Sequence, residues 1–161
     1  MKQEKIRLLF VCMGNICRSP SAEAVMKKIV EDRRLTDRIE IDSAGTIGYH
    51  AGERADSRMR AHASRRGYRL ESLSRPVVTD DFYEFDMIIG MDDQNISDLK
   101  RKAPDWESVE KIHRMTDFSR HKTYDHVPDP YYGGDAGFEL VLDLLEDACE
   151  GLLEHILSDE K

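Results

Sequence analysis

The residues best suited to chemistry are a thiol and a guanidinium, Cys12 and Arg18, within the stretch 12–19, CMGNICRS. A thiolate is a strong nucleophile, and a guanidinium can donate two parallel hydrogen bonds to two oxygens of one phosphoryl group. Gly14 and Asn15 are residue types that tolerate the left-handed backbone of a tight curl. The stretch therefore predicts a loop that holds a phosphoryl group beside a nucleophilic sulfur.

Two elements must position this loop. The apolar run 8–11 leads into it and predicts a buried strand near 5–11. Apolar residues then recur at helical spacing, which predicts a helix over 19–34, with Ser19 as its N-cap and Pro20 in its first turn. Backbone N–H groups ahead of a helix, together with the helix dipole, attract an anion. The same field favours the thiolate form of Cys12, so that Cys12 attacks phosphorus while the loop holds the oxygens.

The stretch 11–20, VCMGNICRSP, resembles the signature of the low-molecular-weight protein tyrosine phosphatases. A second signature of that family, Asp-Pro-Tyr-Tyr, stands at 129–132, and the resemblance covers nearly the whole chain. It implies one phosphatase domain over 1–161, with a Rossmann-like fold. It also implies a phosphoric monoester hydrolase with a phosphocysteine intermediate and no cofactor. Its partners would be phosphotyrosine-containing proteins, and inorganic phosphate would be the product.

Three residues carry the catalytic roles that this resemblance implies. Cys12 is the nucleophile and Arg18 binds the phosphoryl group. Asp129 protonates the leaving group and then acts as base toward the water that cleaves the phosphocysteine. An aspartate before a proline is also a common turn former, and Asp125 is a competing carboxylate in the same loop. The motif position favours Asp129.

The remaining site residues bind or support. In the family the loop asparagine bonds a serine after the second strand, which would pair Asn15 with Ser43, and Ser19 would donate to the Cys12 sulfur. Asp92 is best explained as a helix cap. Ile16 favours phosphotyrosine over phosphoarginine, since the related arginine-phosphate phosphatases carry threonine there. The predicted substrate-binding residues are Met13, Gly14, Asn15, Ile16, Cys17, Ser19, Tyr49, Tyr131 and Tyr132.

Two interpretations of Cys17 stay open. It is a small buried side chain, or, as in the family, a thiol that forms a reversible disulfide with the nucleophile and protects it from over-oxidation. Cys149 lies on the apolar stripe of the last helix and is expected in the core. The loop tyrosines are expected to form aromatic pocket walls, although tyrosines are also common on surface loops.

Strand and helix signals alternate along the rest of the chain, which predicts a four-stranded parallel sheet with helices on both faces. Ligands bind such sheets at the carboxyl ends of the strands. We expect strands at 39–42, 87–89 and 109–112, a turn at 43–46 and surface or functional loops at 47–54 and 115–135. We expect helices at 55–66, closed by Gly67, a short one near 82–85, and two at 93–102 and 136–157.

Composition limits the other possibilities. A net charge of -8 argues against nucleic-acid binding, and no apolar run is long enough for a signal segment or a membrane span. Three cysteines do not suit a secreted disulfide framework, so we expect a cytosolic protein. We also expect it to be a monomer or a weak dimer. The histidines show no metal-ligand spacing.

Residues 54–75 hold seven arginines against two acidic side chains, which indicates a solvated face or a surface that steers anionic substrates.

Two rival functions differ in class. A thiol-dependent arsenate reductase of the same fold needs further cysteines for a disulfide relay, and residues 80–95 hold none. A catalytically silent module that binds phosphate or senses oxidants would explain Cys12 and Cys17 but not Asp129. Hydrolysis of p-nitrophenyl phosphate separates the enzyme from the silent module.

Overall fold

The computed structural model describes residues 5–121 and 124–159, without the side chains of Tyr132 and Asp159. Four parallel strands form one sheet in the order β2-β1-β3-β4. The strands are β1 (Ile6–Cys12), β2 (Ile39–Gly45), β3 (Met87–Gly90) and β4 (Ile112–Arg114).

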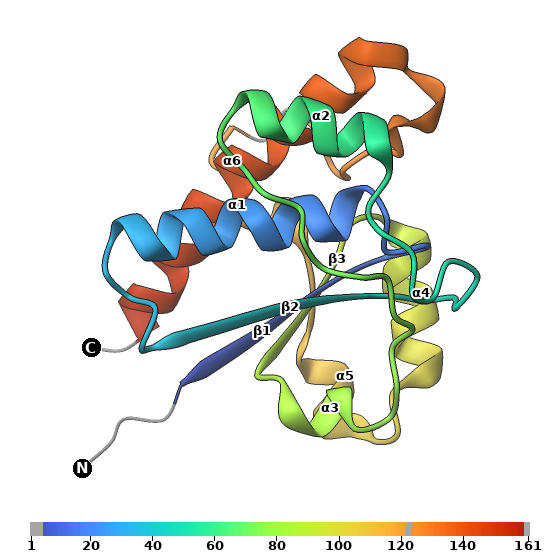
Figure 1. The fold of residues 1–161 in the computed structure, drawn as a ribbon. Helices are drawn as coiled ribbons and strands as arrows, with labels where there is room; N and C mark the ends of the chain where they lie inside the picture. The colour runs from blue at the N-terminus through green and yellow to red at the C-terminus, as the bar shows by residue number, and fades with distance from the viewer. Residues whose placement is uncertain (1–4, 122–123, 160–161) are drawn as a thin grey trace.

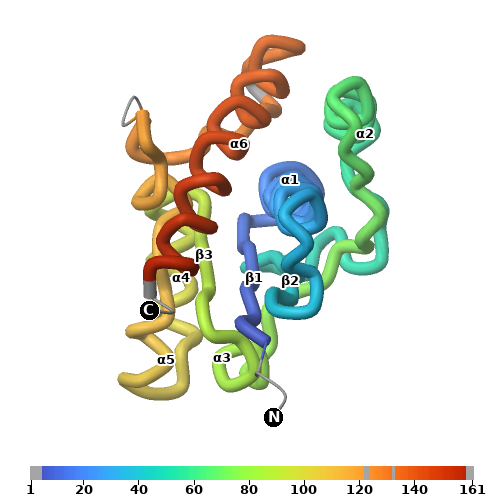
Figure 2. Tube along the Cα trace, turned by 90° about the vertical axis from the view of Figure 1, so that its left-hand side faces the viewer, coloured from blue at the N-terminus to red at the C-terminus, as the bar shows by residue number. Residues whose placement is uncertain are grey.

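Helices cover both faces of this sheet, as predicted (Figure 1). The longer ones, α1 and α6, pack side by side on one face, as the turned views of Figures 1 and 2 both show. The helices are α1 (Arg18–Asp32), α2 (Ser57–Arg65), α3 (Asp81–Glu84), α4 (Asp93–Lys102), α5 (Trp106–Glu110) and α6 (Gly134–Asp159).

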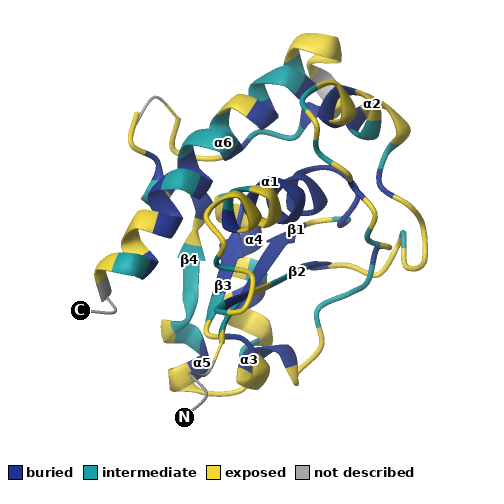
Figure 3. Ribbon diagram, turned by 60° about the vertical axis from the view of Figure 1, so that its left-hand side comes forward, coloured by how far each residue is buried: buried dark blue, intermediate teal, exposed yellow. Residues whose placement is uncertain are grey.

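Side chains of β1 point alternately to the two faces of the sheet, so the strand contributes to a separate hydrophobic core on each face. Leu8 and Phe10 face the larger core, which α1 and α6 complete, whereas Leu9 and Val11 face a smaller core that α3 and α4 close. All four side chains are fully buried, because a central parallel strand is covered on both sides. Figure 3 shows the central strand β1 mostly in dark blue, between helices whose outer faces are exposed. The predicted apolar stripe of α6, Cys149 included, is buried in the larger core.

The register brings the strand ends level at one edge. Cys12 pairs with Gly45 of β2, and Val11 pairs with Gly90 of β3. The chain leaves the sheet at these points, so the loops that follow β1, β2 and β3 share this edge. Glycine is required at position 45, since a Cβ there would lie 2.8 Å from the carbonyl oxygen of Met13.

Two predicted boundaries are wrong beside the site. The expected turn at 43–46 is strand as far as Gly45, so Ser43 lies within β2 rather than after it. Ser19 is not the N-cap of α1, because the helix begins at Arg18 and Cys17 occupies the cap position without a side-chain hydrogen bond.

The prediction of a strand at 109–112 is also wrong. Residues up to Glu110 belong to α5, whose N-cap Asp105 accepts a hydrogen bond from the N–H of Ser108, and β4 begins only at Ile112. Asp-x-x-Ser before an apolar residue is a helix-start pattern that the strand interpretation overlooked.

Other boundaries shift less. The helix expected at 55–66 spans Ser57–Arg65, and Gly67 follows it with a φ of 87°, as a C-terminal glycine does. The long loop contains two short 3-10 turns, Met115–Phe118 and Pro130–Tyr132. Within the described residues, no helix is long and apolar enough to cross a membrane.

Candidate active site

A small cavity of about 80 Å³ opens at the carboxyl edge of the sheet. It brings together the thiol, the guanidinium and the carboxylate that the sequence singles out, although Asp129 lies more than a hundred residues from the other two. The lining residues are Cys12, Met13, Gly14, Ile16, Cys17, Arg18, His50, Asp129 and Tyr131.

The sulfur of Cys12 lies at the floor of this cavity, at the end of β1, and its residue is only 3% exposed. Ser19 approaches it twice. The Ser19 hydroxyl oxygen lies 3.1 Å from Sγ, and the Ser19 backbone N–H donates to Sγ at 3.4 Å. Donors directed at sulfur stabilise a thiolate over a thiol. The Ser19 hydroxyl also lies 3.4 Å from the Ala44 carbonyl oxygen, so it can donate either to that carbonyl or to a Cys12 thiolate, and it does not cap the helix.

The loop between β1 and α1 turns through Asn15, whose φ is 56°. The Asn15 amide nitrogen donates to the hydroxyls of Ser19 at 2.7 Å and Ser43 at 3.0 Å, and its oxygen accepts from the backbone N–H of Arg75 at 3.0 Å. Ser43 in turn donates to the buried carboxylate of Glu23 at 2.5 Å. The structure thus contains the predicted contact of Asn15 with Ser43 and extends it to two further elements.

The backbone N–H groups of this loop are open, in the sense that they donate no hydrogen bond to the described part of the protein. Among the described residues, none accepts a hydrogen bond from the N–H groups of residues 14–18, although residues 15–18 are buried. Successive unpaired N–H groups at a helix start form a nest for an anion. A loop with such N–H groups beside the Cys12 sulfur can bind an oxyanion.

Arg18 is 4% exposed, and only one nitrogen of its guanidinium, Nη1, makes hydrogen bonds to described residues. Its Nη1 donates to the Asp92 carboxylate at 2.6 Å and to the Val127 carbonyl at 3.0 Å. The described residues offer no hydrogen-bond partner to Nε or Nη2, which leaves both free for an oxyanion. Burial by itself would lower the pKa of Arg18, but the Cys12 sulfur and the bonded Asp92 outweigh burial and raise that pKa.

Asp92 caps α4, as predicted, and does more. One carboxylate oxygen accepts the Asn95 N–H at 2.8 Å in a capping box, while the other pairs with Arg18. The residue is thus both a helix cap and the anchor of the guanidinium.

Asp129 lines the same cavity as the loop. One of its oxygens accepts the backbone N–H of Tyr131 at 3.0 Å, which caps a short 3-10 turn. The other oxygen has no partner among the described residues. The competing Asp125 has a 92% exposed side chain, binds His126 and does not line the cavity.

Comparison with known proteins agrees with this geometry. The family model described as low molecular weight phosphotyrosine protein phosphatase matches residues 7–161. This chain belongs to that family of hydrolases.

Individual relatives and solved structures are similar over nearly their full length. A low molecular weight protein-tyrosine-phosphatase of Streptomyces coelicolor is 41% identical over 155 residues, which cover 91% of each protein. A protein tyrosine phosphatase from Entamoeba histolytica, crystallised with Hepes in the active site, has a TM-score of 0.94 and 50% identity, over 98% of this chain and all of that one. An arginine phosphatase of Drosophila has a TM-score of 0.87 and 32% identity, over 94% of this chain and 98% of that one.

One of the predicted aromatic walls lines the cavity of this family member. Tyr131 lines the cavity, and the Arg58 guanidinium lies 4.9 Å from the centre of its ring. Tyr49 is 82% exposed and does not line this small cavity, so its role as an aromatic wall stays a prediction. The side chain of Tyr132 lies outside the described residues.

His50 takes the place expected of Tyr49. Its ring lines the cavity, and Tyr49 packs edge-on against it with ring centroids 5.0 Å apart. Sequence reasoning missed His50 because no motif contains it. The only available signal was a histidine next to the predicted wall residue, in a loop expected near the site.

Cys17 is buried beside the nucleophile and lines the same cavity. Burial raises the pKa of its thiol, and the negative charges of Asp56, Cys12 and Asp129 raise it further. It is unpaired, as are Cys12 and Cys149. A protonated thiol is a poor nucleophile, so the chemistry of this cavity rests on Cys12 rather than Cys17.

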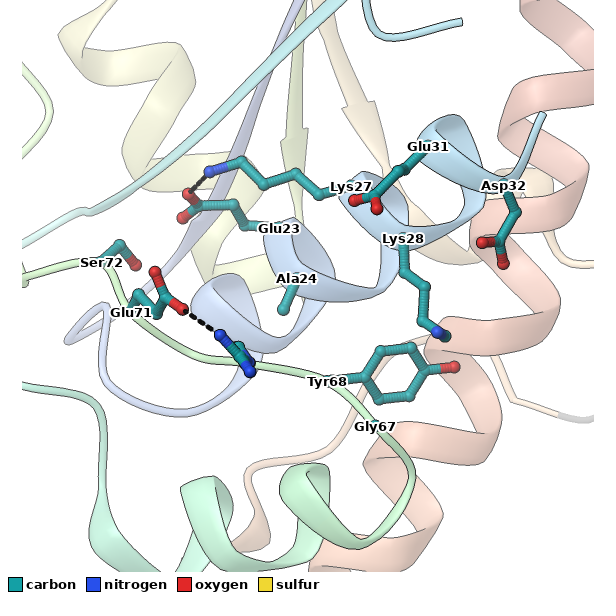
Figure 4. A pocket seen from close by; sticks show the side chains of 11 residues that line it. Glu23, Ala24, Lys27, Lys28, Glu31, Asp32, Gly67, Tyr68, Glu71 and Ser72 are labelled. Carbon is teal, nitrogen blue, oxygen red and sulfur yellow. Dashed lines mark hydrogen bonds and ion pairs between the residues drawn. The ribbon is translucent and has the colours of Figure 1, made fainter. Parts of the chain in front are cut away.

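A larger cavity, of about 430 Å³, lies elsewhere, between α1 and residues 67–72 (Figure 4). Four of its seven charged lining residues form pairs, Lys27 with Glu23 and Arg69 with Glu71, and no cysteine lines it. Within the described ranges, no three His, Cys, Asp or Glu side chains gather to hold a metal ion.

Ion pairs occupy part of the arginine-rich segment 54–75. Arg66 binds Glu139, Asp143 and Glu146 of α6, and Arg75 binds Asp42 and Asp81. These two arginines tie elements together and add little free positive charge. Steering by the others stays a prediction.

Proposed function

We propose that this protein is a phosphotyrosine-protein phosphatase that acts on phosphotyrosine-containing proteins. The observation that carries the proposal is that one loop lines a single cavity with Cys12 and Arg18 and that, among the described residues, the backbone N–H groups of its residues 14–18 have no acceptor. Such a site offers a nucleophile and a full set of donors for the oxygens of one phosphoryl group.

In the first step the Cys12 thiolate attacks phosphorus, and the bond between phosphorus and the tyrosine oxygen breaks. Asp129 gives its proton to the departing phenolate oxygen. The three equatorial oxygens are held by the loop amides and by Nε and Nη2 of Arg18. The products of this step are the free tyrosine side chain and a phosphocysteine.

In the second step Asp129, now a carboxylate, takes a proton from water, which attacks phosphorus. The bond between phosphorus and sulfur breaks, inorganic phosphate leaves, and the sulfur departs as thiolate. The Ser19 hydroxyl, 3.1 Å from Sγ, stabilises that departing charge. A reducing, cytosolic compartment suits this chemistry, since the first step requires a free Cys12 sulfur and the second step regenerates it.

Phosphoarginine is a second candidate substrate, because the Drosophila arginine phosphatase shares this fold. Ile16, which is nearly buried and lines the cavity, favours phosphotyrosine instead. Arsenate reduction lacks support. Besides Cys12 and Cys17 the chain has only Cys149, which is fully buried in the core and unsuited to a disulfide relay.

The test is hydrolysis of p-nitrophenyl phosphate by the native chain and three variants. Cys12→Ser should abolish turnover. Asp129→Asn should lower kcat by roughly 10²–10⁴-fold, because a general acid contributes about that much. The matched control Asp125→Asn, four residues before Asp129 in the same loop, should retain activity. A native chain without turnover would instead indicate a phosphate-binding module.

A panel of phosphotyrosyl and phosphoarginyl peptides then decides the substrate class. We expect kcat/KM to favour phosphotyrosine. Replacing Ile16 by threonine should narrow that preference if the residue at this position sets it. Preferential cleavage of phosphoarginine by the native chain would overturn the assignment.

A further inference from the structure

Two aromatic side chains are exposed at the amino edge of the sheet, opposite the edge that holds the candidate active site. Helix α3 precedes β3 and helix α5 precedes β4, and these two strands are parallel neighbours. The two short helices therefore lie side by side at the amino ends of their strands, as Figures 1 and 3 both show. Tyr83 of α3 is 59% exposed, and Trp106, the only tryptophan of the chain, is 81% exposed at the start of α5.

A hydrogen bond joins the two helices and brings these side chains onto one surface. The Tyr83 hydroxyl donates to the Asp105 carboxylate at 3.2 Å, and Asp105 directly precedes Trp106. Partial desolvation raises the pKa of the Tyr83 phenol, and the negative charges of Asp105 and Glu107 raise it further. Glu107 therefore also lies close to the Tyr83 hydroxyl.

This surface is rich in carboxylates and poor in cations. We define the acidic aromatic surface as Tyr83 and Trp106 with four exposed acidic residues, Asp80, Asp105, Glu107 and Glu110. None of the four carboxylates forms an ion pair with a residue that the structure describes. The one cation within 78–86 and 104–111 is Lys111, whose ammonium donates to a backbone carbonyl of α3 at 2.8 Å. The surface thus keeps an excess of negative charge.

The carboxylates of α6 differ from those of this surface, because they hold the fold together. Three of them bind Arg66 and two more bind Arg120. On the acidic aromatic surface, a structural role is evident only for Asp105, which caps α5. Neighbouring exposed aromatic side chains are typical of binding surfaces, where tryptophan and tyrosine contribute more affinity than most residue types.

The chemistry of the surface selects its occupant. Tryptophan is the aromatic side chain that attracts a cation best, and a guanidinium can stack on it and also donate two parallel hydrogen bonds to a carboxylate. The negative charge repels nucleic acids and anionic lipid surfaces. A second copy of this chain fits less well, since Arg66 and Arg75 of its arginine-rich segment are already bound within the fold.

We propose that the acidic aromatic surface is a docking site for an arginine-containing, positively charged segment of a partner protein. An arginine of that segment stacks on the Trp106 indole, and further basic side chains pair with the carboxylates of Glu107 and Glu110. Because the surface lies at the opposite edge of the sheet from Cys12, an occupied surface leaves the cavity open. Binding weakens as salt rises, since exposed charges are screened.

The probe is a dye-labelled peptide in which arginine alternates with glycine, and fluorescence anisotropy measures its Kd for the full native chain at low salt. Matched peptides carry lysine or glutamate in place of arginine. We expect the arginine peptide to bind roughly two- to fivefold more tightly than the lysine peptide, and the glutamate peptide not to bind. The unlabelled arginine peptide should shift the Trp106 emission to shorter wavelength, because the sole indole leaves water.

Two variants locate the binding site. Trp106→Ala should weaken binding of the arginine peptide roughly five- to tenfold. The double variant Glu107→Gln, Glu110→Gln should weaken it several-fold and reduce its dependence on salt. The matched control Glu31→Gln, Asp32→Asn removes the same charge from exposed positions of α1 and should bind like the native chain. Urea unfolding verifies that each variant is folded.

Two results would overturn the proposal. The first is a Kd that neither surface variant changes, since the peptide would then bind elsewhere on this acidic chain. The second is self-association of the native chain in sedimentation velocity that Trp106→Ala abolishes, which would make a second copy the occupant. Neither readout depends on turnover, so a failure of docking is distinguishable from a failure of the proposed phosphatase function.

Discussion

Two helices begin at the same edge of the sheet, α1 after β1 and α4 after β3, and their first turns are built in opposite ways. The start of α4 is closed, because Asp92 and Asn95 satisfy each other's backbone N–H groups in a capping box. The start of α1 is open. Its cap position has no side-chain hydrogen bond, and the amides of residues 14–18 have no acceptor among the described residues.

Under the proposed function, the helix with the unpaired N–H groups, α1, is the one whose first turn binds the ligand. A buried polar group without a partner costs about 1–3 kcal/mol, so a run of open amides persists only where other contacts hold the backbone. Around α1 the Asn15 network and the ion pair of Arg18 with Asp92 provide these contacts. Helix α4 therefore supports the start of α1, because the second carboxylate oxygen of its cap Asp92 binds Arg18.

Substitutions of Asn15 should give the largest effect, because this side chain holds the loop at the start of α1. Asn15→Gly keeps a residue that tolerates the positive φ but removes three hydrogen bonds, so we expect roughly a hundredfold loss of kcat/KM through a misplaced loop. Asn15→Ala should be less stable than Asn15→Gly by about 1 kcal/mol, because alanine is strained at this φ. Phosphatase kinetics and urea unfolding measure the two effects.

The matched control lies in the closed helix. Asn95 is as buried as Asn15, and its side-chain oxygen accepts the backbone N–H groups of Met91 and Asp92. Asn95→Ala should lower the free energy of unfolding with a much smaller loss of activity. Equal activity losses at positions 15 and 95 would contradict the division between an open and a closed helix.

The double role of Asp92 can be separated by two substitutions. Asn remains a good N-cap whereas Ala does not, so Asp92→Ala should be less stable than Asp92→Asn by about 1 kcal/mol. Both lose the charge that orients Arg18, and both should lose roughly tenfold in kcat/KM. Asp105, which caps α5 outside the cavity, supplies the control: Asp105→Ala should lose stability alone. If Asp92→Asn keeps full activity, the ion pair does not position Arg18.

The smallest expected effect concerns a third helix start, that of α2. Burial alone would raise the pKa of its cap Asp56, but hydrogen bonds from the Arg58 side chain and the N–H groups of Met59 and Arg58 lower that pKa below its usual value. A lowered carboxyl pKa stabilises the fold above about pH 4, and this contribution is lost as pH falls through the folded-state value.

Asp56→Asn should therefore reduce the free energy of unfolding at pH 7 by less than about 1 kcal/mol, since asparagine keeps the cap but not the charge. The difference in free energy of unfolding between this variant and the native chain should disappear in strong acid, where the Asp56 carboxylate is protonated. Urea unfolding at pH 7 and at pH 2 measures it, and a gap of the same size at both pH values would show that the carboxylate charge contributes nothing.

Much of the fold was predictable because its signals are local. The apolar runs of β1 and β3 and the stripe of α6 identify buried elements from spacing alone, and the limits predicted for α4, 93–102, agree with the structure. At 109–112, where two apolar and two charged residues were predicted to form a strand, periodicity could not separate a strand from the end of a helix. The hydrogen bond of Ser108 to Asp105 decided it.

The sequence by itself determined the phosphate-binding loop. Its thiol, its left-handed turn, its arginine and its serine are contiguous in the stretch 11–20, and local backbone geometry follows from residue type. Only the tertiary structure decided what surrounds that loop. Arg75 reaches Asn15 across 60 residues, Asp92 reaches Arg18 across 74, and His50 rather than Tyr49 faces the cavity. These contacts depend on how separate loops pack at the sheet edge, and no short-range pattern in the chain encodes that packing.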